Sequence, residues 1–165
     1  MDAIAVGIDF SKTSLAAMRL AGDIAVRAKA DLYIIWVETV EEDLETAETK
    51  LQNFTKELQQ KLPENKVSYR IVNGRKVYTA LNAAVKECKA DLLVIGTHGN
   101  SGYDEKFAGA NAYKTITISY APVLTVRENF NFDKELERLV MPIDSTRDTR
   151  QKVPWTIEFS RMFPH

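Results

Sequence analysis

Apolar residues follow two different spacings along the first 127 residues of the chain. Short apolar runs predict strands at residues 4–8, 32–37, 92–95 and 123–126, and alternating apolar residues predict a further strand at residues 67–71. Between these runs, apolar residues recur every three or four positions, which predicts helices over residues 15–28, 44–62, 77–88 and 104–118. The second helix has the clearest pattern, with acidic residues at its start, lysines near its end and Pro63 shortly after it.

The order of these elements predicts the class of fold. Strands that alternate with helices are typical of a doubly wound α/β fold, and we expect a five-stranded parallel sheet with strand order 3-2-1-4-5 and helices on both faces. The unbroken apolar run at residues 92–95 is typical of a strand covered on both faces. Ligands of such sheets bind at the carboxyl ends of the strands, near the point where the strand order reverses. Functional residues are therefore expected in segments 7–11, 37–39 and 96–109.

Composition indicates one folded domain and narrows the choice of partners. Hydrophobic residues make up 45% and charged residues 27% of 165 residues, which is typical of a globular domain and leaves no room for a second full one. A formal net charge of −1 argues against nucleic acid or an anionic membrane as partner. Without a membrane-spanning apolar run or a signal-peptide pattern, we expect a cytoplasmic protein. Cys88, the single cysteine, lies on the apolar stripe of the third predicted helix and is expected in the core.

A glycine-rich segment follows the fourth predicted strand. Gly96, Gly99 and Gly102 lie in this segment, and Gly109 lies at a predicted helix start. Glycine lets backbone N–H groups approach an anion, and a helix N-terminus adds a positive dipole, so the segment predicts a phosphate site. A tight strand-to-helix turn is the alternative interpretation of the same glycines. The spacing matches neither the dinucleotide fingerprint nor a Walker loop.

Three segments of the chain carry a resemblance to a known family. Gly96 and Gly99, followed after nine residues by Gly109, match the nucleotide motif of universal stress proteins. Residues 7–11 resemble the first strand and loop of that family, and residues 121–126 resemble its last strand. The resemblance covers about residues 2–127. It implies a regulatory domain for the stress response that binds ATP, or ADP or AMP, with Mg²⁺ or Mn²⁺ on the phosphates.

The resemblance also implies the site residues. By position, Asp9 would contact the nucleoside, the backbone at Val37 would meet the adenine, and Gly96, Gly99 and Gly109 would hold the phosphates. The complete candidate site consists of Gly7, Ile8, Asp9, Val37, Gly96, Thr97, His98, Gly99, Gly109, Ala110 and Asn111. Ala110 replaces the family's Ser or Thr, and the loss of a neutral hydrogen bond of about 1 kcal/mol would weaken affinity severalfold. Asn111 is a candidate substitute donor.

Two of these residues have other interpretations. Asp9 could also cap the first helix together with Ser11. His98 could bond phosphate, serve acid–base chemistry or simply face solvent, and the sequence shows no nucleophile or carboxylate pair to accompany it.

Three functions therefore remain open, in order of preference. We expect a nucleotide-binding regulatory domain and not an enzyme. The alternatives are a dimeric interaction domain that binds no nucleotide, for which Ala110 is the cue, and a slow ATP hydrolase. A homodimer is expected from the family and from the edge strand at residues 123–126, and the further protein partner is unidentified.

The last residues resemble the first ones. Residues 139–146 align without gaps on residues 4–11, which predicts an incomplete second repeat, a strand plus a helix, over residues 139–165, after a linker at residues 128–138. The domain itself would then cover residues 1–127. Because this segment contains several large apolar residues, we expect it to dock on the first domain or on a neighbouring chain, with a flexible tail as the alternative.

Overall fold

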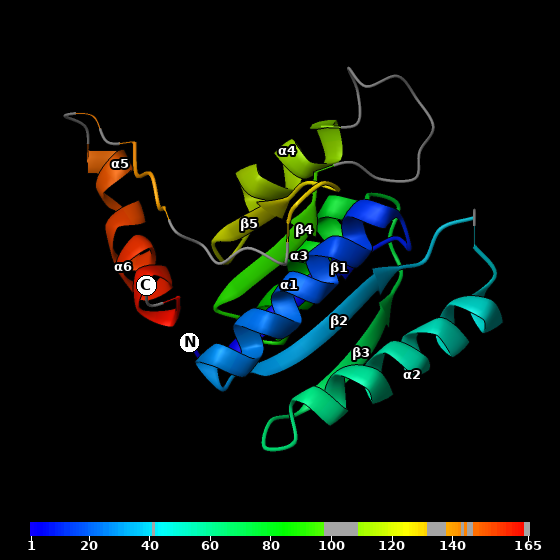
Figure 1. Cartoon of the computed structure of the whole chain (residues 1–165). Coiled ribbons are helices and arrows are strands. Elements are labelled where there is room, and N and C mark those ends of the chain that lie inside the picture. Colours follow the sequence, from blue (N-terminus) through cyan, green and yellow to red (C-terminus); the bar gives the residue numbers. More distant parts are fainter. Residues whose placement is uncertain (41, 98–108, 132–137, 143, 145–146, 164–165) are drawn as a thin grey trace. The chain divides into compact units, whose positions relative to one another are not determined.

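The computed structural model of the chain describes all residues except 41, 98–108, 132–137, 143, 145–146 and 164–165, and it leaves the side chains of 109–111 and 147–148 undescribed (Figure 1). The chain divides into two compact units, Met1–Phe130 and Asn131–His165, and each is described by itself.

The first unit contains a five-stranded sheet in which every neighbouring pair of strands is parallel. The strands are β1 (Ala3–Ile8), β2 (Asp31–Val37), β3 (Val67–Val72), β4 (Leu92–Gly96) and β5 (Val123–Val126). Their order across the sheet is β3-β2-β1-β4-β5. This order confirms the predicted doubly wound fold. Strands β2 and β3 lie on one side of β1, and β4 and β5 lie on the other, so the strand order reverses at β1.

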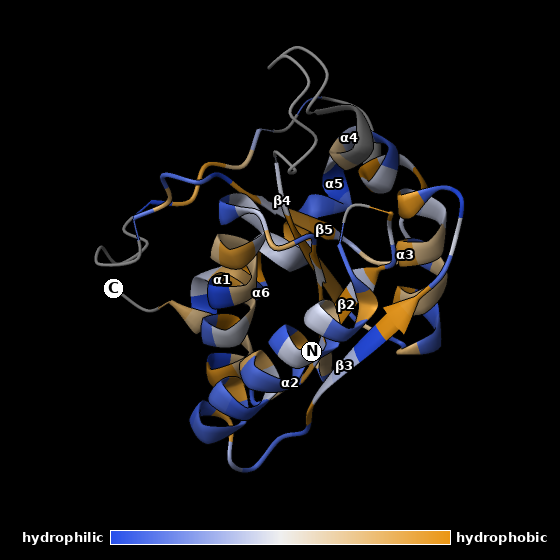
Figure 2. Cartoon of the chain, turned by 90° about the vertical axis from the view of Figure 1, so that its right-hand side faces the viewer, coloured by the Kyte–Doolittle hydropathy of each residue, from blue (hydrophilic) through white to orange (hydrophobic). Residues whose placement is uncertain are grey.

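Helices flank this sheet. They are α1 (Lys12–Ala28), α2 (Leu44–Lys61), α3 (Val77–Glu87) and α4 (Gly109–Ile118). Helices α1 and α2 contact each other on the front face in Figure 1, while α3 lies behind the sheet and contacts α4. The strands carry the apolar residues between the helix layers, as the hydropathy colours of Figure 2 show.

Both faces of the sheet are buried, so the strands alternate between two cores. Residues on the α3 side include Ala5, Ile35 and Leu93, and they form a cluster with Leu81 and Val85 of α3. Cys88 belongs to this cluster and is 8% exposed, which confirms its predicted place in the core. Burial raises the pKa of its thiol above the ordinary value, because the thiolate would lose its hydration.

Helix α2 follows its predicted apolar stripe with one exception at the first residue. Ala47, Leu51 and Leu58 are buried as predicted. Leu44, the first residue of the helix, is 45% exposed. Asp43 caps this end, accepting hydrogen bonds from the backbone N–H and the hydroxyl of Thr46 at 3.0 and 3.1 Å.

The second unit contains two short helices, α5 (Arg147–Arg150) and α6 (Lys152–Met162). The strand predicted from residue 139 is not formed at residues 139–142 and 144, because a strand requires a paired neighbour and the described residues of this unit include none. None of the described residues of α6 is buried.

A hydrogen bond between Asp144 and Thr149 has the same spacing as one in the first unit. The backbone N–H of Asp144 donates to the Thr149 hydroxyl at 3.3 Å. In the first unit, the backbone N–H of Asp9 donates to the Ser14 hydroxyl at 3.2 Å. Asp144 and Thr149 each lie 135 positions after their counterparts in this pair. Helix α5 begins at Arg147, also 135 positions after Lys12, where α1 begins.

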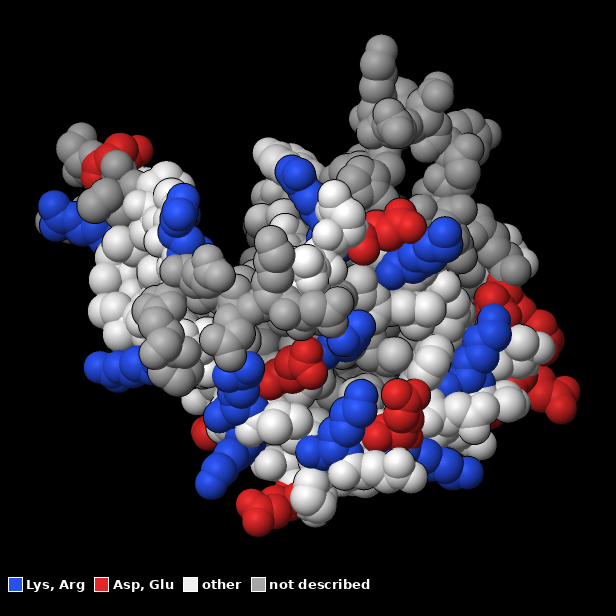
Figure 3. Space-filling view, in the orientation of Figure 1, with Lys and Arg blue, Asp and Glu red and all other residues white. Residues whose placement is uncertain are grey.

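Charge and hydropathy of the surface agree with the composition. Basic and acidic side chains are interspersed over the face shown in Figure 3, as the net charge of −1 suggests. None of the helices in the described part of the chain combines the length and apolar character that crossing a membrane requires.

Candidate functional site

The candidate site lies at the carboxyl edge of the sheet, where three strands end side by side. Ile8, the last residue of β1, lies opposite Trp36 of β2, and Gly7 lies opposite Ile95 of β4. The next residues along the chain are Asp9, Val37 and Gly96, so the parallel register brings these three candidates to one edge (Figure 1). Helices α1 and α4 also begin at this edge, because each follows a strand that ends there.

Asp9 caps the turn into α1, as the alternative interpretation predicted. Its Oδ1 accepts hydrogen bonds from the backbone N–H of Ser11 at 3.1 Å and from the Ser11 hydroxyl at 2.5 Å. Ser11 is the N-cap itself and accepts from the backbone N–H of Ser14 at 3.2 Å. The Asp9 side chain remains exposed, so the same turn that caps the helix presents a carboxylate at the carboxyl edge of β1.

Gly96 is required by close packing between β4 and the first turn of α1. A Cβ atom at this position would lie 2.7 Å from the backbone carbon of Thr13 and 2.9 Å from the backbone nitrogen of Ser14. The absence of a side chain therefore lets the end of β4 lie directly against the N-terminus of α1. The backbone of Gly96, the first residue of the predicted phosphate segment, is thus in contact with the start of α1.

The next residue, Thr97, ties the end of β4 to β5. Its backbone N–H donates to the carbonyl of Val126 at 2.9 Å, and its hydroxyl donates to the same oxygen at 3.3 Å. These bonds use the N–H of Thr97 within the sheet and join the end of β4 to the end of β5.

Gly7 and Ile8 lie beneath this edge. A Cβ atom at Gly7 would come within 2.9 Å of the Leu81 side chain, which places Gly7 against α3. Ile8 is 6% exposed and its side chain belongs to the core. These two residues shape the end of β1 through packing.

The last part of the candidate site begins at Gly109. Gly109, Ala110 and Asn111 are the first described residues of α4, which agrees with the predicted helix over residues 104–118 as far as the structure describes it. His98 and Gly99 lie outside the described residues, and the site prediction for them stays untested.

Sequence reasoning missed the role of Phe10. This residue has a φ angle of +62°, in the left-handed region that bulky side chains rarely adopt at a cost of roughly 1–2 kcal/mol. Its ring lies 5.9 Å from the Trp36 ring and 6.4 Å from the Phe54 ring, measured between centroids. The aromatic type of residue 10 and the helical spacing of Phe54 were visible in the sequence, but their contact depends on the tertiary fold.

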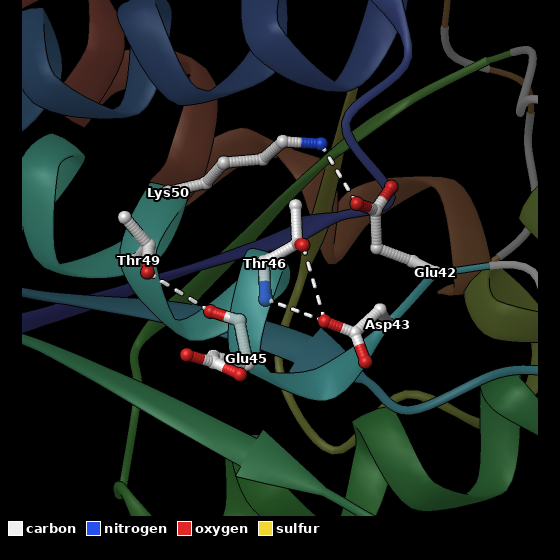
Figure 4. A network of polar contacts seen from close by, with 6 residues as sticks. All are labelled: Glu42, Asp43, Glu45, Thr46, Thr49 and Lys50. Carbon is white, nitrogen blue, oxygen red and sulfur yellow. Dashed lines mark hydrogen bonds and ion pairs between the residues drawn. The ribbon is translucent and has the colours of Figure 1, made fainter.

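A half-buried ion pair covers the Phe10 ring. The Lys50 ammonium lies 4.8 Å from the ring centroid and 2.8 Å from Oε1 of Glu42. The two side chains are 41% and 27% exposed, respectively. Figure 4 shows Lys50 extending from α2 toward Glu42, next to the cap that Asp43 forms with Thr46.

The arrangement is suited to binding an anion. Helix N-termini carry a positive dipole end that favours an anion, and α1 and α4 begin at this edge together with glycine backbone. Among the described residues, no group of three or more His, Cys, Asp or Glu side chains is placed to hold a metal ion.

The chain is similar in sequence to two curated universal stress proteins. A universal stress protein of Mycolicibacterium smegmatis is 29% identical over 135 residues, which are 75% of this chain and 45% of that protein. A universal stress protein of Thermus aquaticus is 39% identical over 57 residues, which are 34% of this chain and 41% of that protein. The chain thus spans less than half the length of these curated relatives.

Solved structures of the same kind share the fold. A universal stress protein in complex with cAMP is 27% identical, with a TM-score of 0.57 over 76% of this chain and 96% of that chain. A universal stress protein from Lactobacillus plantarum is 18% identical, with a TM-score of 0.66 over 76% of this chain and 97% of that one. The model of the universal stress protein family matches residues 1–127, and the chain therefore belongs to the universal stress protein family.

Proposed function

We propose that this chain is a regulatory domain that binds an adenine nucleotide, preferentially ATP with Mg²⁺ or Mn²⁺, at the carboxyl edge of its sheet. The observation that carries the proposal is the meeting of Asp9, Val37 and Gly96 with two helix starts at the point where the strand order reverses. The cAMP complex of a structural relative supports an adenine nucleotide as the ligand class. ADP and AMP are the alternatives within that class.

The base is proposed to bind beside Val37. Backbone bonds alternate along β2, since the N–H of Asp31 donates toward β1 and the N–H of Leu32 donates toward β3. By this alternation the carbonyl of Val37 faces the β1 side, but β1 ends at Ile8, opposite Trp36. The Val37 carbonyl is thus directed past the end of β1, where it can accept a hydrogen bond from the amino group of adenine.

The phosphates are proposed to lie over the starts of α1 and α4. Gly96 brings the end of β4 within contact distance of Thr13 and Ser14 in the first turn of α1, and Gly109 begins α4. Positive helix ends and glycine backbone stabilise phosphate charge. The bound divalent cation would neutralise the phosphates, whose oxygens and water would supply most of its ligands.

A regulatory role requires that nucleotide changes the conformation or assembly of the protein. We propose such a role in the cytoplasm, where adenine nucleotides are abundant. Slow ATP hydrolysis is the alternative that would make the protein an enzyme, and release of inorganic phosphate from ATP would show it. An interaction domain without nucleotide is the second alternative, for which the missing hydroxyl at Ala110 is the specific observation.

Isothermal titration of ATP with Mg²⁺ into the purified chain tests the proposal. We expect micromolar affinity, and we expect Gly109→Asp to abolish it because a carboxylate at the start of α4 adds bulk and negative charge. Thr117→Asp adds the same charge near the exposed end of the same helix and should leave affinity unchanged. No heat at millimolar ATP would contradict the nucleotide function and favour the interaction domain.

We also propose that the domain forms a homodimer through β5. This strand is an edge of the sheet, so its outer backbone groups have no strand beside them within the described part of the first unit. A second copy related by a two-fold axis could pair with the same edge. Sedimentation of a dilution series tests this, and a monomer at micromolar concentration would contradict it.

We also propose that residues 139–165 are an incomplete second repeat, which follows a linker at residues 128–138. The hydrogen bond from Asp144 to Thr149 and the start of α5 lie at the same offset from their counterparts in the first unit. This coincidence supports a turn built like the one after β1. Limited proteolysis tests whether the segment is protected by docking, as we predict, or is cleaved as a flexible tail.

A further inference from the structure

Contacts of Phe10 connect helix α2 to the segment that carries Asp9. Phe10 directly follows Asp9, and its ring lies beside Trp36 of β2 and Phe54 of α2. Lys50, one helical turn before Phe54, lies over the ring and is bonded to Glu42. A continuous set of contacts therefore runs from Glu42, ahead of α2, to the Asp9 carboxylate.

The backbone conformation of Phe10 makes these contacts relevant to the site. With a φ angle of +62°, Phe10 turns the chain sharply between β1 and α1. This turn folds the Asp9 carboxylate back onto Ser11 at the carboxyl edge of the sheet. Since the left-handed region is unfavourable for phenylalanine, contacts that hold its ring must offset the cost. The ring contacts and the orientation of Asp9 are therefore coupled through one residue.

We propose that Lys50 and Glu42 are positioning residues of the nucleotide site, which hold the Phe10 ring and thereby the Asp9 carboxylate in the orientation that meets the nucleoside. This inference rests on the proposed function and deepens it. Coupling between two sites is reciprocal, so bound nucleotide also stabilises the packing of Lys50 on Phe10. Nucleotide binding is thus linked to the start of helix α2.

The direction in which substitutions change nucleotide affinity distinguishes this positioning role from a simple charge effect of Lys50. If Lys50 attracted the anionic nucleotide through its charge alone, Glu42→Gln would remove a negative charge and strengthen binding. If the pair acts through Phe10, Glu42→Gln loosens Lys50 and weakens binding. Lys50→Arg keeps a cation for both Glu42 and the ring, so it should retain the affinity of the unmodified chain.

The experiment measures the dissociation constant of ATP with Mg²⁺ by titration calorimetry. We expect Lys50→Met and Glu42→Gln each to raise it about 3- to 10-fold, and the double variant to raise it no further than the larger single effect. Lys61→Met is the matched control, because Lys61 forms an exposed pair with Glu57 at the other end of the same helix. Thermal unfolding without nucleotide should be unchanged in Lys61→Met, whose pair is exposed, and only slightly lowered in the Lys50 and Glu42 variants, because the Trp36 and Phe54 rings still hold Phe10.

Tryptophan fluorescence reports directly on the packing of Trp36 against Phe10. The chain has two tryptophans, so Trp155→Phe leaves Trp36, 5.9 Å from Phe10, as the single fluorophore of this kind. Nucleotide should change Trp36 emission in this background, and Lys50→Met should remove the change at saturating nucleotide.

Each outcome has a distinct meaning. Weaker binding in both single variants, with rescue by Lys50→Arg and an unaffected Lys61→Met, supports the inference. Normal binding in Lys50→Met, or stronger binding in Glu42→Gln, overturns it and leaves the proposed function intact. If the unmodified chain binds no nucleotide, the proposed function fails first and this inference fails with it.

Discussion

Single residues at the carboxyl edge are constrained by packing as much as by any ligand. Gly96 shows this most directly, because a methyl group there would overlap the backbone of Thr13 and Ser14. A helix backbone cannot move aside as a flexible side chain can. Part of the glycine pattern that resembles a nucleotide motif is therefore already explained by the fold, and the same closeness places β4 against the start of α1.

Gly96→Ala should consequently destabilise the protein even without nucleotide. We expect the free energy of unfolding, measured by urea denaturation, to fall by roughly 1–3 kcal/mol because the first turn of α1 must shift. Gly22→Ala is the control, since a Cβ there meets only the flexible end of the Leu58 side chain and alanine favours helix by about 1 kcal/mol. Equal stability of the Gly96→Ala variant would contradict the close packing.

Cys88 allows a second test at this scale, because its pKa is raised by burial. The folded chain should react with a thiol reagent at pH 8 at least about ten times more slowly than the chain unfolded in urea, since the thiolate is the reactive form. The unfolded thiol ionises at lower pH than the folded one, so this group should lower stability as pH rises past its ordinary pKa. Fast reaction of the folded chain would contradict the buried position.

At the scale of elements, the sequence was informative wherever burial is periodic. All five strands were predicted within one residue of their ends, because the strands covered on both faces are apolar throughout and β3 alternates between apolar and polar residues. The left-handed turn at Phe10 and the ion pair over its ring were not predicted. They depend on Lys50 and Phe54, more than 35 positions away, and no local pattern reports such a contact.

Helix α2 provides the test at this scale through its cap. The backbone N–H of Thr46 and then its hydroxyl lower the pKa of Asp43. A lowered folded-state pKa stabilises the protein above the ordinary value of 3.8, and this contribution is lost as pH falls through the lowered pKa. Asp43→Ala should therefore lower the midpoint of urea unfolding at pH 7 more than at pH 3.

Asp43→Asn is the matched control for this prediction. Asparagine keeps an oxygen that can accept from Thr46 but does not titrate, so stability at pH 7 should be partly retained. The variant should lose the part of the acid dependence that Asp43 contributes. If Asp43→Ala unfolds as the unmodified chain does at both pH values, the hydrogen bonds of the cap contribute nothing measurable.

At the scale of the whole molecule, the incomplete second repeat stays a prediction, and its strand is not formed at residues 139–142 and 144. The alignment of residues 139–146 on residues 4–11 is based on local similarity, whereas a strand forms only beside another strand. The first copy of the segment has β2 and β4 on either side. The described residues of the second unit provide no such neighbours, which explains why residues 139–142 and 144 form no strand.

The first unit should therefore fold without the second. Every buried hydrophobic residue in the described part of the chain lies between Ile4 and Val126, and no described residue of α6 is buried. We expect a chain that ends at Phe130 to unfold cooperatively, followed by circular dichroism, and to bind ATP as the full chain does, whereas docking of residues 131–165 on the first unit would raise the melting temperature of the full chain above that of the shortened one. A chain that ends at Tyr120 should lose several degrees, because it lacks β5 and the buried Val126. If the chain that ends at Phe130 also melts several degrees lower, residues 131–165 dock on the first unit, as their apolar residues predict.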